Sequence, residues 1–198
     1  RISRMWREGR RGSVQGTYDF ETSEPFKGSQ SQRITFTSGR GEIGIENQGL
    51  NRWGLYVQAG KEYEVVVWAR AEKATPMVVA LESSDGAKIY VEANLTVRSS
   101  KWQRLEFTLT PQITDKNARF AIKLAEPGSV VLGYAFLQPG PWGRFKNLPI
   151  RRDVAEALVA QGLTVLRYGG CMVNIDTYRW KNMLGPRDQR PPYRGFWF

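Results

Sequence analysis

The feature that most constrains the fold is a change of hydrophobic period across a joint rich in Pro and Gly, at Gln138–Gly143. Before this joint, between residues 14 and 137, apolar and polar residues alternate in short runs, the clearest of which is Gln103–Thr110. Alternation with a period of two is typical of β-strands with one buried face. After the joint, Arg151–Gln161 carries apolar residues at helical spacing. Two periods on either side of such a joint indicate two different folds in one chain.

The alternating runs before the joint predict roughly nine or ten short strands. Gly, Pro and Asp residues separate these runs, and Asp85–Gly86 is a pair that tolerates the positive φ angles of a tight hairpin. The first alternating run starts at about Val14, and no stretch up to residue 137 has a convincing helical pattern. Short strands joined by such turns are typical of an antiparallel β-sandwich or jelly roll, so the chain is expected to be mostly β.

The part after the joint predicts one α/β unit. A helix is expected over Arg151–Gln161, and Gly162 supplies the flexible residue that commonly follows a helix end. The apolar run Leu163–Leu166 is expected to be a buried strand that ends at Arg167, just before the pair Gly169–Gly170. In a β/α barrel, the carboxyl ends of the strands carry the residues that contact ligands. Arg167 is therefore the first candidate for a site residue.

Composition excludes several classes of function. The chain has no His and a single Cys, so it has no Ser-His-Asp triad, no Cys-His pair and no His-ligated metal site, and no cofactor is expected. No apolar run approaches the length of a membrane span. The net charge is +10, but the 14 basic residues of Gly12–Gly143 are matched by 14 acidic residues. Because the excess lies at the two ends of the chain, nucleic-acid binding is disfavoured.

Four motifs resemble one family of enzymes. They are Phe136-Leu-Gln-Pro-Gly, Arg152-Asp-Val-Ala-Glu-Ala-Leu, Leu166-Arg-Tyr-Gly-Gly-Cys, and the stretch from Tyr178 to Pro191 with Tyr-Arg-Trp-Lys and Gly-Pro-Arg-Asp-Gln-Arg-Pro. Together they are similar to the α-L-arabinofuranosidases of glycoside hydrolase family fifty-one, which have a (β/α)8 barrel. The resemblance covers most of the last 60 residues. More weakly, the part before it is similar to a carbohydrate-binding-module-like sandwich inserted early in some members.

The resemblance implies a division into three segments. Residues 1–11 would end an upstream barrel segment. Residues 12–138 would form the β-sandwich, which would be a jelly roll of the galactose-binding-like type. Residues 139–198 would form a βα piece of the (β/α)8 barrel. The chain is then expected to be a segment of a longer enzyme.

The resemblance also implies a set of substrate-binding residues. Arg167 would line the sugar pocket and orient a catalytic group, although a structural ion pair at the barrel mouth is the alternative. Cys171 matches a position on the substrate side, and a buried thiol is its alternative. Because the family's Pro is missing before Gly169, Asn174 is a second candidate for that position. Trp197 matches an aromatic residue of the pocket wall.

Catalytic carboxylates are not expected in this chain. Retaining glycosidases use two carboxyl groups about 5 Å apart. None of the acidic residues after the joint, which are Asp153, Glu156, Asp176 and Asp188, matches the family's glutamates. The expected activity is release of terminal α-L-arabinofuranosyl units with retention, from arabinan or arabinoxylan. The expected partners are such a polysaccharide or oligosaccharide and the remainder of the same enzyme, with no nucleic acid and no membrane.

A non-catalytic carbohydrate-binding module is the alternative function. Sugar-binding sandwiches use aromatic rings as platforms for the apolar faces of sugar rings. Five aromatic residues are candidates, although a core position is the favoured interpretation of each: Trp53, Tyr56, Trp68, Tyr90 and Trp102. A basic interaction domain is a third possibility, which the neutral charge of Gly12–Gly143 disfavours.

Overall fold

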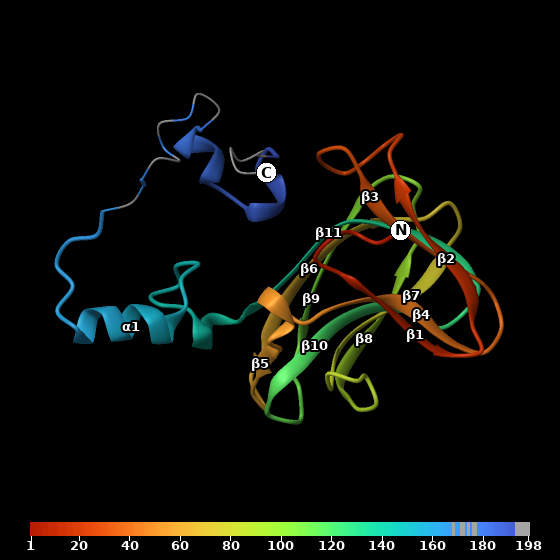
Figure 1. Cartoon of the computed structure of the whole chain (residues 1–198), viewed down its shortest axis with the longest axis horizontal. Helices are drawn as coiled ribbons and strands as arrows, with labels where there is room; N and C mark the ends of the chain where they lie inside the picture. The colour runs from red at the N-terminus through yellow and green to blue at the C-terminus, as the bar shows by residue number, and fades with distance from the viewer. Residues whose placement is uncertain (168, 171–172, 174, 176–177, 193–198) are drawn as a thin grey trace. The chain divides into compact units, whose positions relative to one another are not determined.

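The structure is a computed structural model that describes residues 1–167, 169–170, 173, 175 and 178–192 (Figure 1). The chain divides into two compact units, a sandwich unit Arg1–Trp142 and a C-terminal unit Gly143–Phe198. No helix in the described residues is long and apolar enough to cross a membrane.

The sandwich unit contains two antiparallel sheets (Figure 1). The first has the strand order β1-β4-β10-β7-β8, with β5 paired to β10 beside this path. Its strands are β1 (Arg7–Gly12), β4 (Gly41–Asn47), β5 (Leu55–Val57), β7 (Thr75–Glu82), β8 (Ile89–Val97) and β10 (Asp115–Leu124).

The second sheet is five-stranded, with the order β2-β3-β11-β6-β9. Its strands are β2 (Gln15–Glu21), β3 (Ser31–Ser38), β6 (Tyr63–Arg70), β9 (Gln103–Leu109) and β11 (Gly128–Pro139). The long strand β11 pairs with both β3 and β6, and its register shifts between Leu132 and Tyr134.

The core lies between the sheets and is built by the alternation visible in the sequence. On β6, Val65 and Val67 are fully buried, whereas Val66 and Trp68 between and after them are half-buried. Ile122 of β10 is likewise fully buried. These side chains belong to one continuous cluster of buried apolar residues. The predicted antiparallel β-sandwich is therefore confirmed.

The first strand of the sandwich was not predicted. Strands were expected from about Val14, but β1 pairs with β4 along its whole length, from Arg7 opposite Glu46 to Gly12 opposite Gly41. Its side chains are almost all exposed, so it carries no apolar alternation, and backbone hydrogen bonds to β4 define it. The expected segment boundaries at residues 11 and 138 remain predictions.

The C-terminal unit contains helix α1 (Arg152–Ala160), as predicted, and the short 3₁₀ turns η4 (Trp180–Met183) and η5 (Arg187–Gln189). The strand expected at Leu163–Leu166 is not formed: these residues are coil, and Val165 and Leu166 are 78% and 76% exposed. A barrel strand needs parallel neighbours on both sides. The described residues of this unit contain no other strand, so the prediction of a buried strand is wrong for the chain as it stands.

Candidate functional site

The outer face of the five-stranded sheet, which points away from the core, gathers aromatic and polar side chains. Three cross-strand rows across β9, β6 and β11 define its centre. The rows are Arg104–Trp68–Tyr134, Glu106–Val66–Phe136 and Thr108–Glu64–Gln138. Because side chains of one strand alternate between faces, residues two apart in each strand lie together here.

Three aromatic rings pack together at one end of this face. The ring of Phe26, from the β2–β3 connection, stacks on Trp68 with a centroid distance of 4.8 Å and an interplanar angle of 29°. It meets Trp102 edge-on at 5.3 Å. Gly133 makes this possible, because a Cβ at that position would lie 2.2 Å from Cβ of Phe26. Phe26 therefore forms a fixed wall beside the rows.

A second aromatic pair continues along β11. The rings of Tyr134 and Phe136 lie 6.3 Å apart with an interplanar angle of 29°, and both side chains are half-buried. Beside them, Nε2 of Gln138 donates a hydrogen bond to Oε2 of Glu64 at 2.7 Å. Aromatic surface and hydrogen-bonding groups thus adjoin on neighbouring strands.

Arg70 ends β6 on the same side of the sheet. Its side chain is buried, lies 3.5 Å from a carboxylate oxygen of Glu21, and places the guanidinium 5.4 Å from the ring centroid of Trp102. Its Nε is buried and has no acceptor in the part of the chain that the structure describes. A buried donor of this kind is stabilised by any acceptor that reaches it.

Glu21 is held in its charged form next to Arg70. The hydroxyl and backbone N–H of Ser23 both donate to Oε1 of Glu21, and Arg33 donates to Oε2. These hydrogen bonds, those of Ser23 first, lower the pKa of Glu21 to about 2, against a usual 4.5, although burial acts in the opposite direction. The charges at this end of the face are therefore fixed above acidic pH.

Flat aromatic surface bordered by amide, carboxylate and guanidinium groups suits a carbohydrate. The C–H faces of a sugar ring pack on aromatic rings, and its hydroxyls both donate and accept hydrogen bonds. No cluster of metal-binding side chains occurs among residues 1–167 or the other described positions.

The structure places the five aromatic candidates at three different locations. Trp68 and Trp102 lie on or beside the outer face. Tyr90 is a core residue whose hydroxyl donates to Oδ2 of Asp115 at 2.7 Å, and burial together with Asp115 raises its pKa to about 12. Trp53 and Tyr56 are 73% and 54% exposed. Trp53 directly follows the 3₁₀ turn η1 (Leu50–Arg52), and Tyr56 lies in β5, which belongs to the other sheet.

The residues expected around the barrel strand belong to the C-terminal unit. Arg167 is described and exposed, in coil. Cys171, Asn174 and Trp197 lie outside the described residues. All four remain predictions.

Sequence reasoning missed Phe26, Arg70, Tyr134 and Phe136. For the last two, the sequence predicts strands up to residue 137, but which residues of β11 point outward depends on the register shift between Leu132 and Tyr134. Such a bulge exchanges the faces of all later residues and leaves no signal in the alternation. For Phe26, the partner Gly133 lies more than a hundred residues away.

Comparison with known families decides where the chain belongs. The family model described as "Carbohydrate binding domain" matches residues 9–129. The chain belongs to this carbohydrate-binding family. The match begins within β1, at Gly9, and ends before Tyr134 and Phe136.

The curated relatives of this carbohydrate-binding chain are arabinofuranosidases, which confirms the resemblance seen in the sequence. Extracellular exo-α-L-arabinofuranosidase of Streptomyces chartreusis is 30% identical over 169 residues, covering 77% of this chain and 20% of the relative. α-L-Arabinofuranosidase 1 of Arabidopsis thaliana is 27% identical over 163 residues, covering 78% and 24%. The chain thus spans about a fifth to a quarter of the length of these relatives.

Two solved structures share its fold. An arabinose-bound α-L-arabinofuranosidase of glycoside hydrolase family fifty-one superposes with a TM-score of 0.78 and 21% identity, covering 96% of this chain and 32% of that chain. A CBM4 domain superposes with a TM-score of 0.51 and 15% identity, covering 68% and 86%. The second match shows that the sandwich unit has the fold of that CBM4 domain.

Proposed function

We propose that the outer face of the five-stranded sheet binds a carbohydrate chain. The observation that carries this proposal is the adjacency of aromatic and hydrogen-bonding side chains on the solvent side of a sheet, within a domain of a carbohydrate-binding family. The apolar core lies on the opposite face of this sheet, so packing in the core does not explain why aromatic residues lie on the outer face.

A mode of binding follows from the three rows. A sugar ring packs against the Tyr134 and Phe136 side, while the hydrogen-bonded pair of Glu64 and Gln138 offers both an acceptor and a donor to its hydroxyls. The ring of Phe26, stacked on Trp68, bounds this surface at the Trp68 end. The pair is pre-ordered, so binding costs little side-chain entropy.

We also infer that this chain is a segment of a retaining glycoside hydrolase that releases terminal α-L-arabinofuranosyl residues. Its curated relatives are arabinofuranosidases four to five times its matched length. In this proposal, residues 139–198 are a partial (β/α)8 barrel whose pocket receives Arg167, Cys171, Asn174 and Trp197, and the catalytic glutamates lie elsewhere in the longer polypeptide. The exposed apolar residues around Leu163–Leu166 support it, because a barrel would cover them.

Affinity electrophoresis of the 198-residue chain, in gels that contain arabinoxylan or arabinan, tests the binding face. We expect retardation of the parent chain and a loss of affinity of about tenfold or more for Phe136→Ala and for Tyr134→Ala. The matched control is Trp53→Ala, which removes an exposed aromatic ring from the loop between η1 and β5, away from the five-stranded sheet. Loss of retardation in the control alone would move the site to the η1–β5 region, and full retention in all three variants would refute an aromatic site.

The enzymatic proposal has a separate test. The 198-residue chain should release no product from an aryl α-L-arabinofuranoside, since it supplies no catalytic carboxylate in this scheme. The longer polypeptide should release arabinose whose first-formed anomer has the configuration of the substrate, measured by NMR. Hydrolysis by the 198-residue chain alone would contradict the proposal, and binding without any activity in the longer polypeptide would favour a non-catalytic binding module.

A further inference from the structure

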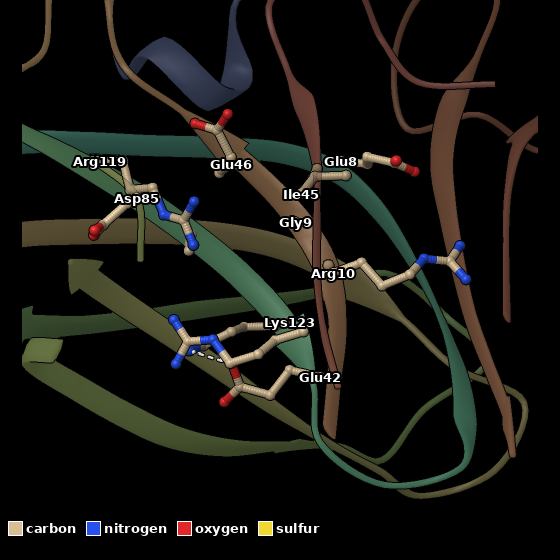
Figure 2. Close-up of a pocket in the computed structure, with 12 residues that line it drawn as sticks. Glu8, Gly9, Arg10, Glu42, Ile45, Glu46, Asp85, Arg119 and Lys123 are labelled. Carbon is tan, nitrogen blue, oxygen red and sulfur yellow. Dashed lines mark hydrogen bonds and ion pairs between the residues drawn. The ribbon is translucent and has the colours of Figure 1, made fainter. Parts of the chain in front are cut away.

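A hollow of about 130 Å³ lies on the outer face of the other sheet, around β1, β4 and β10 (Figure 2). This face is separated from the proposed carbohydrate face by the whole core, because the two belong to different sheets. Neither the family resemblance nor the proposed function uses it.

The floor of the hollow is made of residues without long side chains. Gly9 of β1 lies opposite Gly44 of β4, and Ala121 of β10 lies opposite Glu46 of β4. A Cβ at Gly9 would have no neighbour closer than the carbonyl oxygen of Gly44 at 3.8 Å. The space above Gly9 is therefore open.

A network of ion-paired side chains forms one side of the hollow. Lys123 of β10 bridges Glu42 and Glu82, with its Nζ 2.9 Å from Oε2 of Glu42. Arg119 donates to Oε2 of Glu82 from Nε at 2.9 Å and from Nη2 at 2.8 Å. Glu82 is fully buried beneath these two cations. Donors and acceptors beside the hollow are thus held in place before any ligand arrives.

The charges that line the hollow cancel. Figure 2 shows Glu8 and Arg10 turned away from the other labelled side chains. The remaining charged lining residues are three acidic and three basic: Glu42, Glu46, Asp85, Arg11, Arg119 and Lys123. A site for a phosphate or for a metal ion carries an excess of one sign, whereas a balanced set of charged groups suits a neutral ligand with many hydroxyls.

One acceptor at the hollow lacks a donor. The side chain of Glu46 is 4% exposed, and its Oε1 forms an ion pair with Arg52, 2.7 Å from Nη2. Its Oε2 is buried and has no partner among the residues that the structure describes. A buried carboxylate oxygen without a donor is destabilising, and a hydroxyl group of a ligand can supply the missing donor.

We propose that this hollow binds one neutral sugar unit, as a second carbohydrate site on the opposite side of the sandwich. Hydroxyls of the ligand accept from Arg119, Lys123 or Arg11 and donate to Glu46 or Asp85. The site has no aromatic platform, so recognition rests on hydrogen bonds. The proposal goes beyond the function proposed above and stands even where the five-stranded sheet binds nothing.

Titration of the ¹⁵N-labelled 198-residue chain with L-arabinose, followed by amide NMR, tests it. We expect saturable shifts of the amides of Gly9, Gly44 and Ala121. Gly9→Leu fills the hollow and should abolish these shifts, while shifts at Val66 and Phe136 on the other sheet stay unchanged. Gly9→Ala is the matched control and should keep them, and Gly9→Val replaces Gly9→Leu if the larger side chain disturbs β1.

The amide spectrum separates the two sites, because each has its own reporters. Shifts at Gly9, Gly44 and Ala121 that saturate and vanish only in the filled variant support the proposal, whatever happens at Val66. It is overturned by the absence of these shifts up to about 100 mM sugar, or by their persistence in the filled variant. Saturation by inorganic phosphate but not by L-arabinose would also overturn it.

Discussion

Glu82 shows how a single residue on a sheet face can control stability. It is fully buried and accepts hydrogen bonds from Arg119 and Lys123, which are themselves largely buried. Glu82→Ala leaves two desolvated cations without their shared partner, a change that costs about 3–5 kcal/mol when a buried ion pair loses one member. Urea denaturation should show this loss in the free energy of unfolding.

Glu106→Ala is the control for Glu82. Glu106 also pairs with an arginine, Arg104, but its side chain is 63% exposed. Exposed pairs contribute about 0–1 kcal/mol, so the control should unfold almost as the parent chain does. Equal losses in the two variants would contradict the role assigned to burial.

Glu21 predicts a dependence of stability on acid pH. Its folded pKa is about 2, below the usual 4.5, because Ser23 and Arg33 donate to the charged form. The stabilisation is therefore fully present above about pH 4.5 and is lost as pH falls towards 2. We expect Glu21→Gln to lose of the order of 1–2 kcal/mol at pH 7 and to show a smaller decrease between pH 4.5 and 2. Parallel pH profiles for parent and variant would exclude Glu21 as the titrating group.

At the scale of elements, the β2–β3 connection packs against β11 because Gly133 has no side chain and leaves room for Phe26. A Cβ at Gly133 would meet Cβ of Phe26 at 2.2 Å and Trp102 at 2.9 Å. Gly133→Ala should push Phe26 off Trp68, with a loss of about 1–3 kcal/mol from overpacking. Tryptophan fluorescence should shift to the red as Trp68 and Trp102 gain solvent. Gly9→Ala, which meets no close neighbour, should leave the spectrum and the stability unchanged.

The elements differ in how far the sequence predicts them. Strands β9 and β10 follow from clear alternation, because one face of each packs on the core. Strand β1 does not, because its exposed side chains leave only backbone pairing to β4. The outward residues of β11 depend on a bulge, and the apolar run Leu163–Leu166 predicts a strand that has no neighbour to pair with in the described residues. Local pattern thus predicts buried faces well, but not pairing, register or a missing partner.

At the scale of the whole molecule, the apolar core belongs to one unit. Every buried apolar side chain in the described residues lies between Val14 and Leu132, and none of the residues of α1 is buried. Truncation after Trp142 should therefore keep the cooperative unfolding transition and change Tm by no more than about 2 °C, measured by circular dichroism. A collapse of the transition would show that residues 143–198 are needed for folding of the sandwich.

The exact end of the sandwich can be tested by a second truncation, after Gln138. The sequence places the boundary there, whereas the compact unit extends to Trp142. Trp142 meets the buried ring of Tyr63 edge-on at 5.5 Å and donates from Nε1 to the carbonyl oxygen of Glu62. An aromatic pair of this kind contributes about 0.5–1.5 kcal/mol beyond its buried area. The chain ending at Gln138 should accordingly unfold at lower urea concentration than the chain ending at Trp142, and equal midpoints would place the boundary where the sequence does.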